Sequence, residues 1–501
     1  MTLNRRLFLA GSVASLSAAG ALGGASRALA AARKDLNIGI RLEPPHLDPT
    51  AGAAAAIGEI VYANVFEGLT RIDRDGAVKP ALAESWTISD DGKTYTFKLR
   101  SGVTYHDGAP FDASVAKFNL DRARAPDSVN PQKSLFAPIE AAEAVDPATL
   151  KVTLKQPAGN FLFGLGWPAA VMLAPATAAD AKTKPVGTGP FKFANWTKGA
   201  SVELVRAEKY WGSPLKLDKA VFKVISDPSA SFAALMAGDV DAFPIYPAPE
   251  NLDQFRADPR FKVVIGNTEG KTIMALNNGR KPFDDIRVRR ALCHAVDRKT
   301  VIDGAMFGIA KPIGSHFAPQ DAGYVDLTGK YPYDPAKAKS LLKESGVPEG
   351  TKLRLVLPPP DYARRSGQII AAQLKAVGLD VELVPMEWAQ WLSDVFKGKN
   401  FDMTIISHVE PLDLDIYARD DYYFDYKSPA YKAIYAELTA TTDQAKRIEL
   451  YKKAQEQIAE DAVNVFLFML PKSGVWSADL QGLWENAPIP VNDLTEVSWK
   501  A

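Results

Sequence analysis

The chain has 501 residues, of which 47% are hydrophobic and 24% are charged, a composition typical of a globular protein with more than one domain. Lysine plus arginine and aspartate plus glutamate are equal at 59 each, and this neutral balance argues against a nucleic acid or another polyanion as partner. The single cysteine, Cys293, excludes an intrachain disulfide.

The first 30 residues have the layout of an export signal. Arg5 and Arg6 precede a weakly apolar stretch, and the run Ala28-Leu29-Ala30 supplies the small residues at which such a signal is cut. Glycines and serines interrupt the apolar stretch, which argues against a permanent membrane anchor. The arginine pair resembles a twin-arginine signal. We therefore expect a periplasmic protein whose signal is cleaved near residue 30.

Strands and helices alternate along the rest of the chain. Period-two or continuously apolar runs predict strands at residues 36–40, 94–99, 150–154, 201–205, 220–225, 272–276, 352–357, 380–384, 402–406 and 463–469. Helical spacing of apolar residues predicts helices at 57–66, 112–124, 229–236, 285–296, 298–306, 334–345, 363–377, 388–396 and 447–459. The regular alternation beyond residue 270 indicates an α/β fold.

Catalytic and cofactor patterns are missing from the sequence. The five histidines lie far apart without a metal-ligand spacing, and neither a nucleophile elbow nor a phosphate-binding loop is present. Residues 164–169 match a dinucleotide fingerprint only formally, because Trp167 and Pro168 stand where a tight helix start is needed. These observations predict no enzyme activity, no cofactor and no metal site.

Several ordered segments resemble the peptide- and nickel-binding proteins of bacterial ABC transporters, that is, extracellular solute-binding protein family 5. The matching segments are residues 47–49, 61–69, 82–86, 91–100, 102–103, 106–108, 111–113, 187–191, 285–292 and 295–298. Within them, Asp91-Gly92 and His106-Asp107-Gly108 are typical of turns that need a positive φ angle at glycine, so we interpret them as scaffold.

The resemblance implies an α/β, two-lobed periplasmic binding protein fold of type II, cluster C, with an extra inserted domain. Lobe I would comprise residues 33–75, 185–272 and 473–501, the inserted domain residues 76–184, and lobe II residues 273–472. The lobes would close over a ligand and present a joint surface to a membrane ABC permease. We expect a monomer that does not bind nucleic acid.

The resemblance also points to charged ligand partners, because a closed cleft excludes water. Arg364 and Arg365 open a helix of lobe II, and a guanidinium there would grip a ligand carboxylate. Glu410 and Asp413 follow the strand 402–406, where a carboxylate would bind a ligand amine. The dipeptide-binding branch has an aromatic residue at the position of His408, and it has an aspartate-rich turn where this chain has Glu410 and Pro411.

Further candidates for ligand contact come from their residue types. Aromatic rings suit a surface that accepts any side chain, asparagine offers hydrogen bonds to a ligand backbone, and histidine is the commonest metal ligand. The candidates are Trp388, Trp391, Tyr417, Tyr246, Asn278 and His46. The aromatic run 417–424 has no function that the sequence indicates.

The expected function is capture of a short peptide or peptide-like solute as the substrate-binding component of an ABC importer. An opine, a small oligosaccharide or a nickel chelate are alternative ligands within the same fold. An exported hydrolase is the alternative of another class, although the sequence offers no nucleophile with its base.

Overall fold

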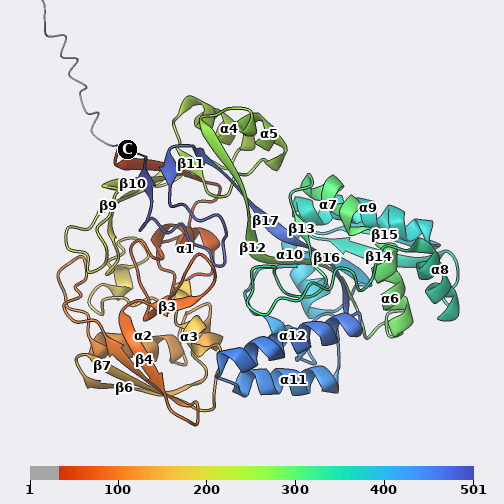
Figure 1. Ribbon diagram of the computed structural model, residues 1–501, viewed down its shortest axis with the longest axis horizontal. Helices are drawn as coiled ribbons and strands as arrows, with labels where there is room; N and C mark the ends of the chain where they lie inside the picture. Colours follow the sequence, from red (N-terminus) through yellow and green to blue (C-terminus); the bar gives the residue numbers. More distant parts are fainter. Residues whose placement is uncertain (1–32, 501) are drawn as a thin grey trace, which may run out of the picture.

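The computed structural model describes residues 33–500, so the expected export signal at 1–30 lies outside the described residues. Strands β12 (Phe261–Leu276) and β17 (Asn464–Ser477) are antiparallel partners that run through both lobes of the protein (Figure 1). Their register shifts between Asn267 and Lys271, where they pass from one lobe to the other. This strand pair joins the two lobes into one continuous sheet, with strand order β15-β14-β16-β12-β17-β11-β1-β10-β9-β8.

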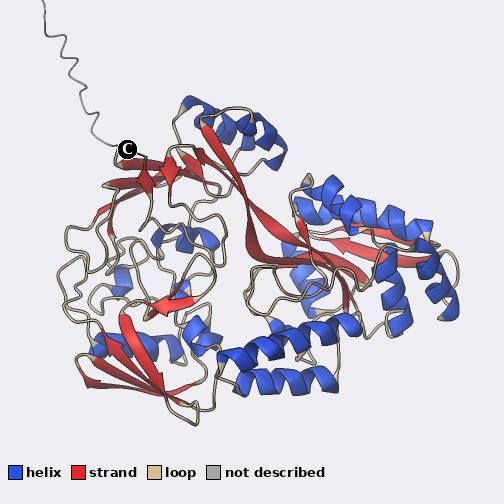
Figure 2. Cartoon of the chain, viewed as in Figure 1, coloured by secondary structure: helices blue, strands red, loops and turns tan. Residues whose placement is uncertain are grey.

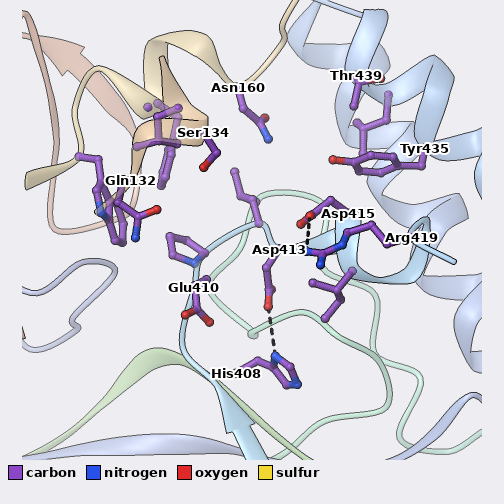
Figure 3. Close-up of a pocket in the computed structure, with 18 of the residues that line it drawn as sticks. Gln132, Ser134, Asn160, His408, Glu410, Asp413, Asp415, Arg419, Tyr435 and Thr439 are labelled. Atoms are coloured by element: carbon purple, nitrogen blue, oxygen red, sulfur yellow. Dashed lines mark ion pairs between the residues drawn. The ribbon is translucent and has the colours of Figure 1, made fainter. Parts of the chain in front are cut away.

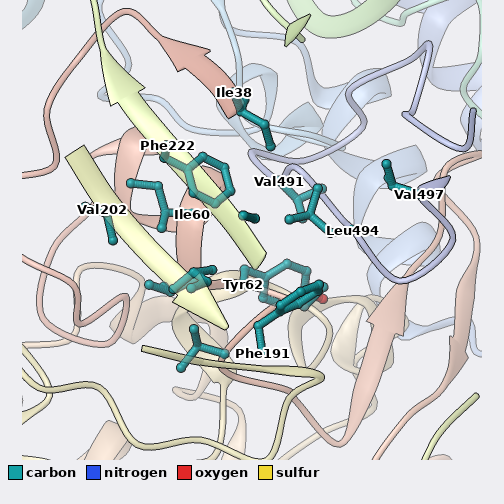
Figure 4. Packing of buried hydrophobic residues seen from close by; sticks show 14 of the residues in the cluster. Ile38, Ile60, Tyr62, Phe191, Val202, Phe222, Val491, Leu494 and Val497 are labelled. Atoms are coloured by element: carbon teal, nitrogen blue, oxygen red, sulfur yellow. The ribbon is translucent and has the colours of Figure 1, made fainter. Parts of the chain in front are cut away.

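The lobe that contains the N-terminal strand is built on the β8 side of this sheet. Its strands are β1 (Asp35–Ile40), β8 (Phe191–Thr197), β9 (Ser201–Arg206), β10 (Lys219–Val224) and β11 (Ala242–Phe243), with a small pair β18 (Leu480–Gln481) and β19 (Ser498–Trp499). Its helices are α1 (Ala55–Val61), α4 (Pro228–Ala237) and α5 (Leu252–Arg256). Apolar side chains of the strands and of α1, among them Ile38, Phe191 and Phe222, form one buried core (Figure 4), and α4 and α5 pack in a second core.

A separate antiparallel sheet, in the order β4-β5-β7-β6, forms the inserted domain. Its elements are β4 (Ala83–Ile88), β5 (Thr94–Leu99), β6 (Ile139–Asp146), β7 (Thr149–Leu154), α2 (Ala113–Arg124) and α3 (Phe161–Gly164), next to the hairpin β2 (Thr70–Ile72) and β3 (Val78–Pro80). Asp112 begins α2 by accepting hydrogen bonds from the backbone of Ser114 and Val115. This domain has a hydrophobic core of its own.

Helices flank the remaining part of the large sheet in the other lobe (Figure 2). The strands are β13 (Lys311–Pro312), β14 (Thr351–Leu357), β15 (Leu379–Pro385) and β16 (Met403–His408). The helices are α6 (Ile286–Ala295), α7 (Arg298–Met306), α8 (Pro335–Glu344), α9 (Asp361–Ala376), α10 (Trp388–Trp391), α11 (Pro429–Ala440) and α12 (Gln444–Glu460). Two cores, one on each face of the sheet, hold this lobe together.

Four expected elements were wrong in extent, and several strands and helices were not predicted. Helix α1 stops at Val61, because Ala63 adopts a positive φ angle of 61°. In place of the helix expected at 388–396, the α-helical part is limited to α10, and the chain continues as a wide π-helical turn at Leu392–Lys397. Strands β12 and β17 extend far beyond 272–276 and 463–469, since each passes from one lobe into the other. Helix α11 was not predicted.

The predicted domain limits at 272/273 and 472/473 fall inside β12 and β17, and the division into lobes stays a prediction at these positions. Across residues 33–500, no helix combines the length and the apolar character that a membrane crossing requires.

Candidate functional site

A cavity of about 730 Å³ opens between the inserted domain and lobe II. One wall comes from residues 132–167 of the inserted domain and the other from residues 391–451. Figure 3 shows Gln132, Ser134 and Asn160 on one side of the cavity, and Glu410 and Asp415 on the other. Clefts of this size that combine apolar and polar lining are typical of small-molecule sites.

The lobe II wall begins where strand β16 ends at His408. The chain then forms the loop 409–413 and a short 3-10 turn, Leu414–Tyr417, which lies beyond a strand's carboxyl end, as ligand loops of α/β sheets do. Glu410 is exposed to the cavity, and among the described residues no cation pairs with its carboxylate. Asp415 lies 3.8 Å from the guanidinium of Arg419, and burial raises its pKa, helped by the nearby charge of Asp413.

Aromatic side chains form the apolar part of this wall. Trp391 and Phe396 stack with ring centroids 6.2 Å apart, and the indole N–H of Trp391 donates to Thr404 Oγ1 at 3.0 Å. Tyr422 and Tyr423 also line the cavity. The run 417–424, unexplained by the sequence, is therefore a packed aromatic layer that supports the cavity from within lobe II.

The opposite wall carries no charge. Its polar groups are the amides and hydroxyl of Gln132, Ser134, Gln156 and Asn160, and its remaining lining residues are apolar or glycine. Such neutral groups donate and accept hydrogen bonds without selecting a ligand by charge.

The two walls touch at one edge of the cavity. Asn160 Oδ1 accepts hydrogen bonds from the guanidinium of Arg447 and, at 3.2 Å, from the hydroxyl of Tyr451. The backbone N–H of Gly159 donates to Thr439 O at 3.2 Å. A Cβ atom at Gly159 would collide with the Arg447 guanidinium, so glycine is required for this close approach.

Beneath the lobe II wall, three potential metal ligands gather: atoms of His316, His408 and Asp413 lie within 4.8 Å of one another. Both ring nitrogens of His316 are already engaged, with Asp413 Oδ1 at 3.0 Å and the Tyr417 hydroxyl at 2.9 Å. The ammonium of Lys271 lies 2.8 Å from the same carboxylate oxygen, where a metal ion would have to displace it. The donor set fits a hydrogen-bonded ion network better than a metal centre.

The structure brings four of the sequence-predicted residues together at the cavity. His408, Glu410 and Asp413 all line it, and so does Trp391. They differ in availability: His408 and Asp413 are engaged with buried partners, whereas the Glu410 side chain faces the cavity.

Two predicted arginines lie outside the cavity lining, on the first turns of α9. Arg364 pairs with Glu387 at 3.2 Å, and the Arg365 guanidinium stacks over the ring of Phe307. Trp388 is 41% exposed and packs edge-on against Trp391. Ligand contact by these three side chains stays a prediction.

The remaining four candidates are placed elsewhere in the scaffold. Tyr417 is buried behind the cavity wall, and Asn278 donates hydrogen bonds to three backbone carbonyls at 2.8–3.1 Å. Tyr246 packs in the aromatic cluster of lobe I near Phe255. His46 accepts a hydrogen bond from the backbone of Asp48 at 3.2 Å. None of the four lines the cavity.

Sequence reasoning missed the residues that hold the site in place: Lys271, His316, Asn160 and Arg447. Lys271 offered one signal, since it directly precedes the apolar strand 272–276 and a lysine buried there needs an acidic partner. The others are isolated polar residues. His316 meets Asp413 and Tyr417, 97 and 101 positions away, and Asn160 meets Arg447, 287 positions away in a different domain.

Two α/β lobes joined by crossing strands, with a further domain and a cavity between them, define a two-lobed periplasmic binding protein of type II. The family model for "Bacterial extracellular solute-binding proteins, family 5 Middle" matches residues 77–429. The chain belongs to this family, as the sequence motifs predicted, and its role is that of the substrate-binding component of an ABC importer.

Known proteins of similar sequence cover almost the whole chain. The glutathione-binding protein GsiB of Salmonella paratyphi A is 31% identical over 479 residues, which cover 91% of this chain and 93% of that protein. The protein of the same name from Pectobacterium atrosepticum is 32% identical over 492 residues, with 93% of each covered.

Solved structures have the same fold. The substrate-binding protein CtaP of Listeria monocytogenes superposes with a TM-score of 0.83 at 25% identity, covering 94% of this chain and all of that one. DppA of Helicobacter pylori, solved in complex with the peptide STSA, gives a TM-score of 0.74 at 26% identity, covering 94% and 99%. The two-lobed fold expected from the sequence is thus confirmed.

Proposed function

We propose that this protein captures a short peptide or a peptide-like amino-acid conjugate in the cavity between lobe II and the inserted domain. The observation that carries the proposal is the pairing of the two walls. Glu410 offers an unpaired carboxylate to a ligand ammonium group, and the neutral amides opposite suit the polar backbone of a peptide. The relatives named as glutathione-binding support this class of ligand, since glutathione is a tripeptide.

In this proposal, the protein binds and releases the ligand without altering it chemically. In the described part of the chain, no serine or threonine hydroxyl in the cavity lining is hydrogen-bonded to a histidine or carboxylate: Ser407 Oγ has no partner, and Thr439 Oγ1 donates to a backbone carbonyl. An activated nucleophile needs such a base. The protein would act as a monomer in the periplasm, after removal of its twin-arginine signal, and would hand the ligand to its membrane permease.

The carboxylate end of the ligand has two sets of candidate partners. Arg419 and Arg447 line the cavity but already bond acidic side chains or carbonyls. Arg364 and Arg365 lie on the neighbouring helix α9, which contacts the end of strand β16 where the backbone N–H of Ser407 donates to the Tyr362 hydroxyl at 3.0 Å. We propose that closure of the lobes brings Arg364 to the ligand.

A thermal-shift panel tests the function. Tripeptides, dipeptides and glutathione are compared with an opine, an oligosaccharide and nickel–histidine, because a bound ligand raises Tm with the logarithm of its saturation. We expect peptides to raise Tm in the wild type and not in Glu410→Ala or Arg364→Ala, with unliganded Tm values nearly unchanged. A shift only with the opine, the oligosaccharide or the nickel complex would contradict the peptide proposal, and turnover of any of them would contradict simple capture.

A further inference from the structure

A buried lysine lies directly beneath the loop that lines the cavity. Lys271 stands on β12 opposite His408 on β16, just after the register shift at which β12 passes between the lobes. Its side chain is 1% exposed, and its ammonium donates to Asp413 Oδ1 at 2.8 Å and to the backbone carbonyl of Glu410 at 2.5 Å. Lys271 therefore contacts the cavity loop twice, from the side away from the ligand.

A chain of hydrogen bonds fixes the same carboxylate from a second direction. Asn464 Nδ2 donates to the Tyr417 oxygen at 3.3 Å, and the Tyr417 hydroxyl donates to His316 Nδ1 at 2.9 Å. His316 must then carry its proton on Nε2, which donates to Asp413 Oδ1 at 3.0 Å. Oδ1 of Asp413 thus receives two internal donors.

The other oxygen of Asp413 is not offered to the cavity either. Oδ2 is shielded from solvent and has no hydrogen-bond donor, and His408 Nδ1 lies 3.7 Å from it. Burial lowers the pKa of His408 to about 3, so this ring is neutral. Asp413 lines the cavity, but its charge is directed inward.

The surroundings of Lys271 and Asp413 keep both side chains ionised. Burial opposes ionisation of Asp413, but His316 and Lys271 outweigh it and hold its pKa well below the usual range. Burial likewise acts to lower the pKa of Lys271, whereas Asp413, Glu269 and Asp321 raise it on balance. The result is an internal ion pair that needs no ligand to complete it.

We propose that Lys271 is a specificity-determining residue: it neutralises Asp413 from within the protein, so that Glu410 alone receives the ammonium group of a ligand. A buried carboxylate without Lys271 would attract a cationic group from the cavity, and the site would then favour ligands with two positive charges. The part that concerns ligand choice rests on the proposed function. The part that concerns neutralisation of Asp413 by Lys271 rests on the ion network alone.

The binding arm uses triglycine and N-acetyl-triglycine as probes in titration calorimetry. The double variant Lys271→Met/Asp413→Asn replaces the ion pair by a neutral pair and should bind triglycine within about threefold of the wild type. Glu410→Gln should weaken triglycine about tenfold or more, as loss of a charged hydrogen bond does, and the acetylated probe should lose a similar factor in the wild type. Equal losses in the double variant and in Glu410→Gln would overturn the proposal.

A second arm needs no ligand and compares Lys271→Met with the double variant Lys271→Met/Asp413→Asn by urea unfolding between pH 5 and pH 8. Without Lys271, Asp413 or its partner His316 takes up a proton in the folded state, so the folded pKa of that group is raised. Stability from such a group is present at low pH and is lost as the pH rises through the folded pKa. We expect Lys271→Met to lose stability toward pH 8 relative to the double variant.

If the stability of these two variants depends on pH in the same way, Lys271 is not the internal counter-ion of Asp413. A wild type that binds neither peptide would refute the proposed function, and the pH comparison would still decide the role of Lys271. If Lys271→Met folds at pH 5 but not at pH 8 while the double variant folds at both, the role of Lys271 as internal counter-ion is supported. The double variant lacks the titrating carboxylate and so has no such pH dependence.

Discussion

The two walls of the cavity are built on opposite plans. The lobe II wall contains every charged residue of the lining, namely Glu410, Asp413, Asp415, Arg419 and Arg447, whereas the inserted-domain wall contains none. The charged wall is supported by buried ion pairs and stacked aromatic rings, which hold its groups in one geometry. In the proposed function, this difference means that one wall would select the charge of a ligand, while the other would close over it with neutral hydrogen-bonding groups.

The largest expected effect is on the residue that joins the walls. Arg447 is 3% exposed, and its guanidinium donates to the carbonyls of Leu438 and Thr441 and to side chains of both walls. Arg447→Met leaves these acceptors unpaired and should lower the free energy of unfolding by about 3 kcal/mol. Urea unfolding measures the loss. The control Arg256→Met, on the half-exposed end of α5, should change stability by less than about 0.5 kcal/mol.

Glu67, in lobe I, sharpens the contrast between buried carboxylates. Its carboxylate accepts from Thr188, Tyr210 and Trp211, all neutral donors, and burial raises its pKa to about 7. Because the folded pKa lies above the ordinary value, its contribution to stability is present below about pH 4.5 and is lost as the pH rises through 7.

Glu67→Gln should therefore remove this dependence. Relative to the variant, the wild type should lose about 2 kcal/mol between pH 5 and pH 8, as measured by urea midpoints at both values. A constant difference between the two proteins would show that Glu67 stays ionised, as Asp413 does.

Asn160 tests whether contact between the walls retains the ligand. Asn160→Ala removes the acceptor for Arg447 and Tyr451 but leaves their other partners, so Tm should fall little. Dissociation of a bound peptide should become about fivefold faster, since one interdomain hydrogen bond is worth about 1 kcal/mol. Stopped-flow tryptophan fluorescence measures this rate, and an unchanged rate would mean that the contact is structural only.

The smallest effect is expected on the neutral wall away from this contact. Gln132→Ala should alter peptide affinity less than about threefold, because a partly exposed neutral amide exchanges a ligand hydrogen bond for one with water. A loss of peptide affinity as large as that in Glu410→Gln would contradict the proposal that the charged wall, and not the neutral wall, selects the ligand.

Local structure followed from the sequence where neighbouring residues decide it. The helix predicted at 112–124 forms with Asp112 as its cap, strand β5 has its predicted bounds, and α4 ends at Gly238 with a φ angle of 78°. His408, Glu410 and Asp413 were predicted because they follow a recognisable apolar strand, and all three line the cavity. Strand β17 was predicted only in part, since its composition changes where it leaves lobe II for lobe I.

By itself, the sequence determined the family, the two-lobed α/β fold and the stretch of chain that forms one wall of the cavity, because motifs, caps and apolar periodicity act over short distances. Only the tertiary structure decided which carboxylate is free. Lys271 and Asp413 are 142 positions apart, as their numbers show, and Asn160 meets Arg447 across a domain boundary. Burial and charge pairing at such separations arise from packing, which no local pattern records.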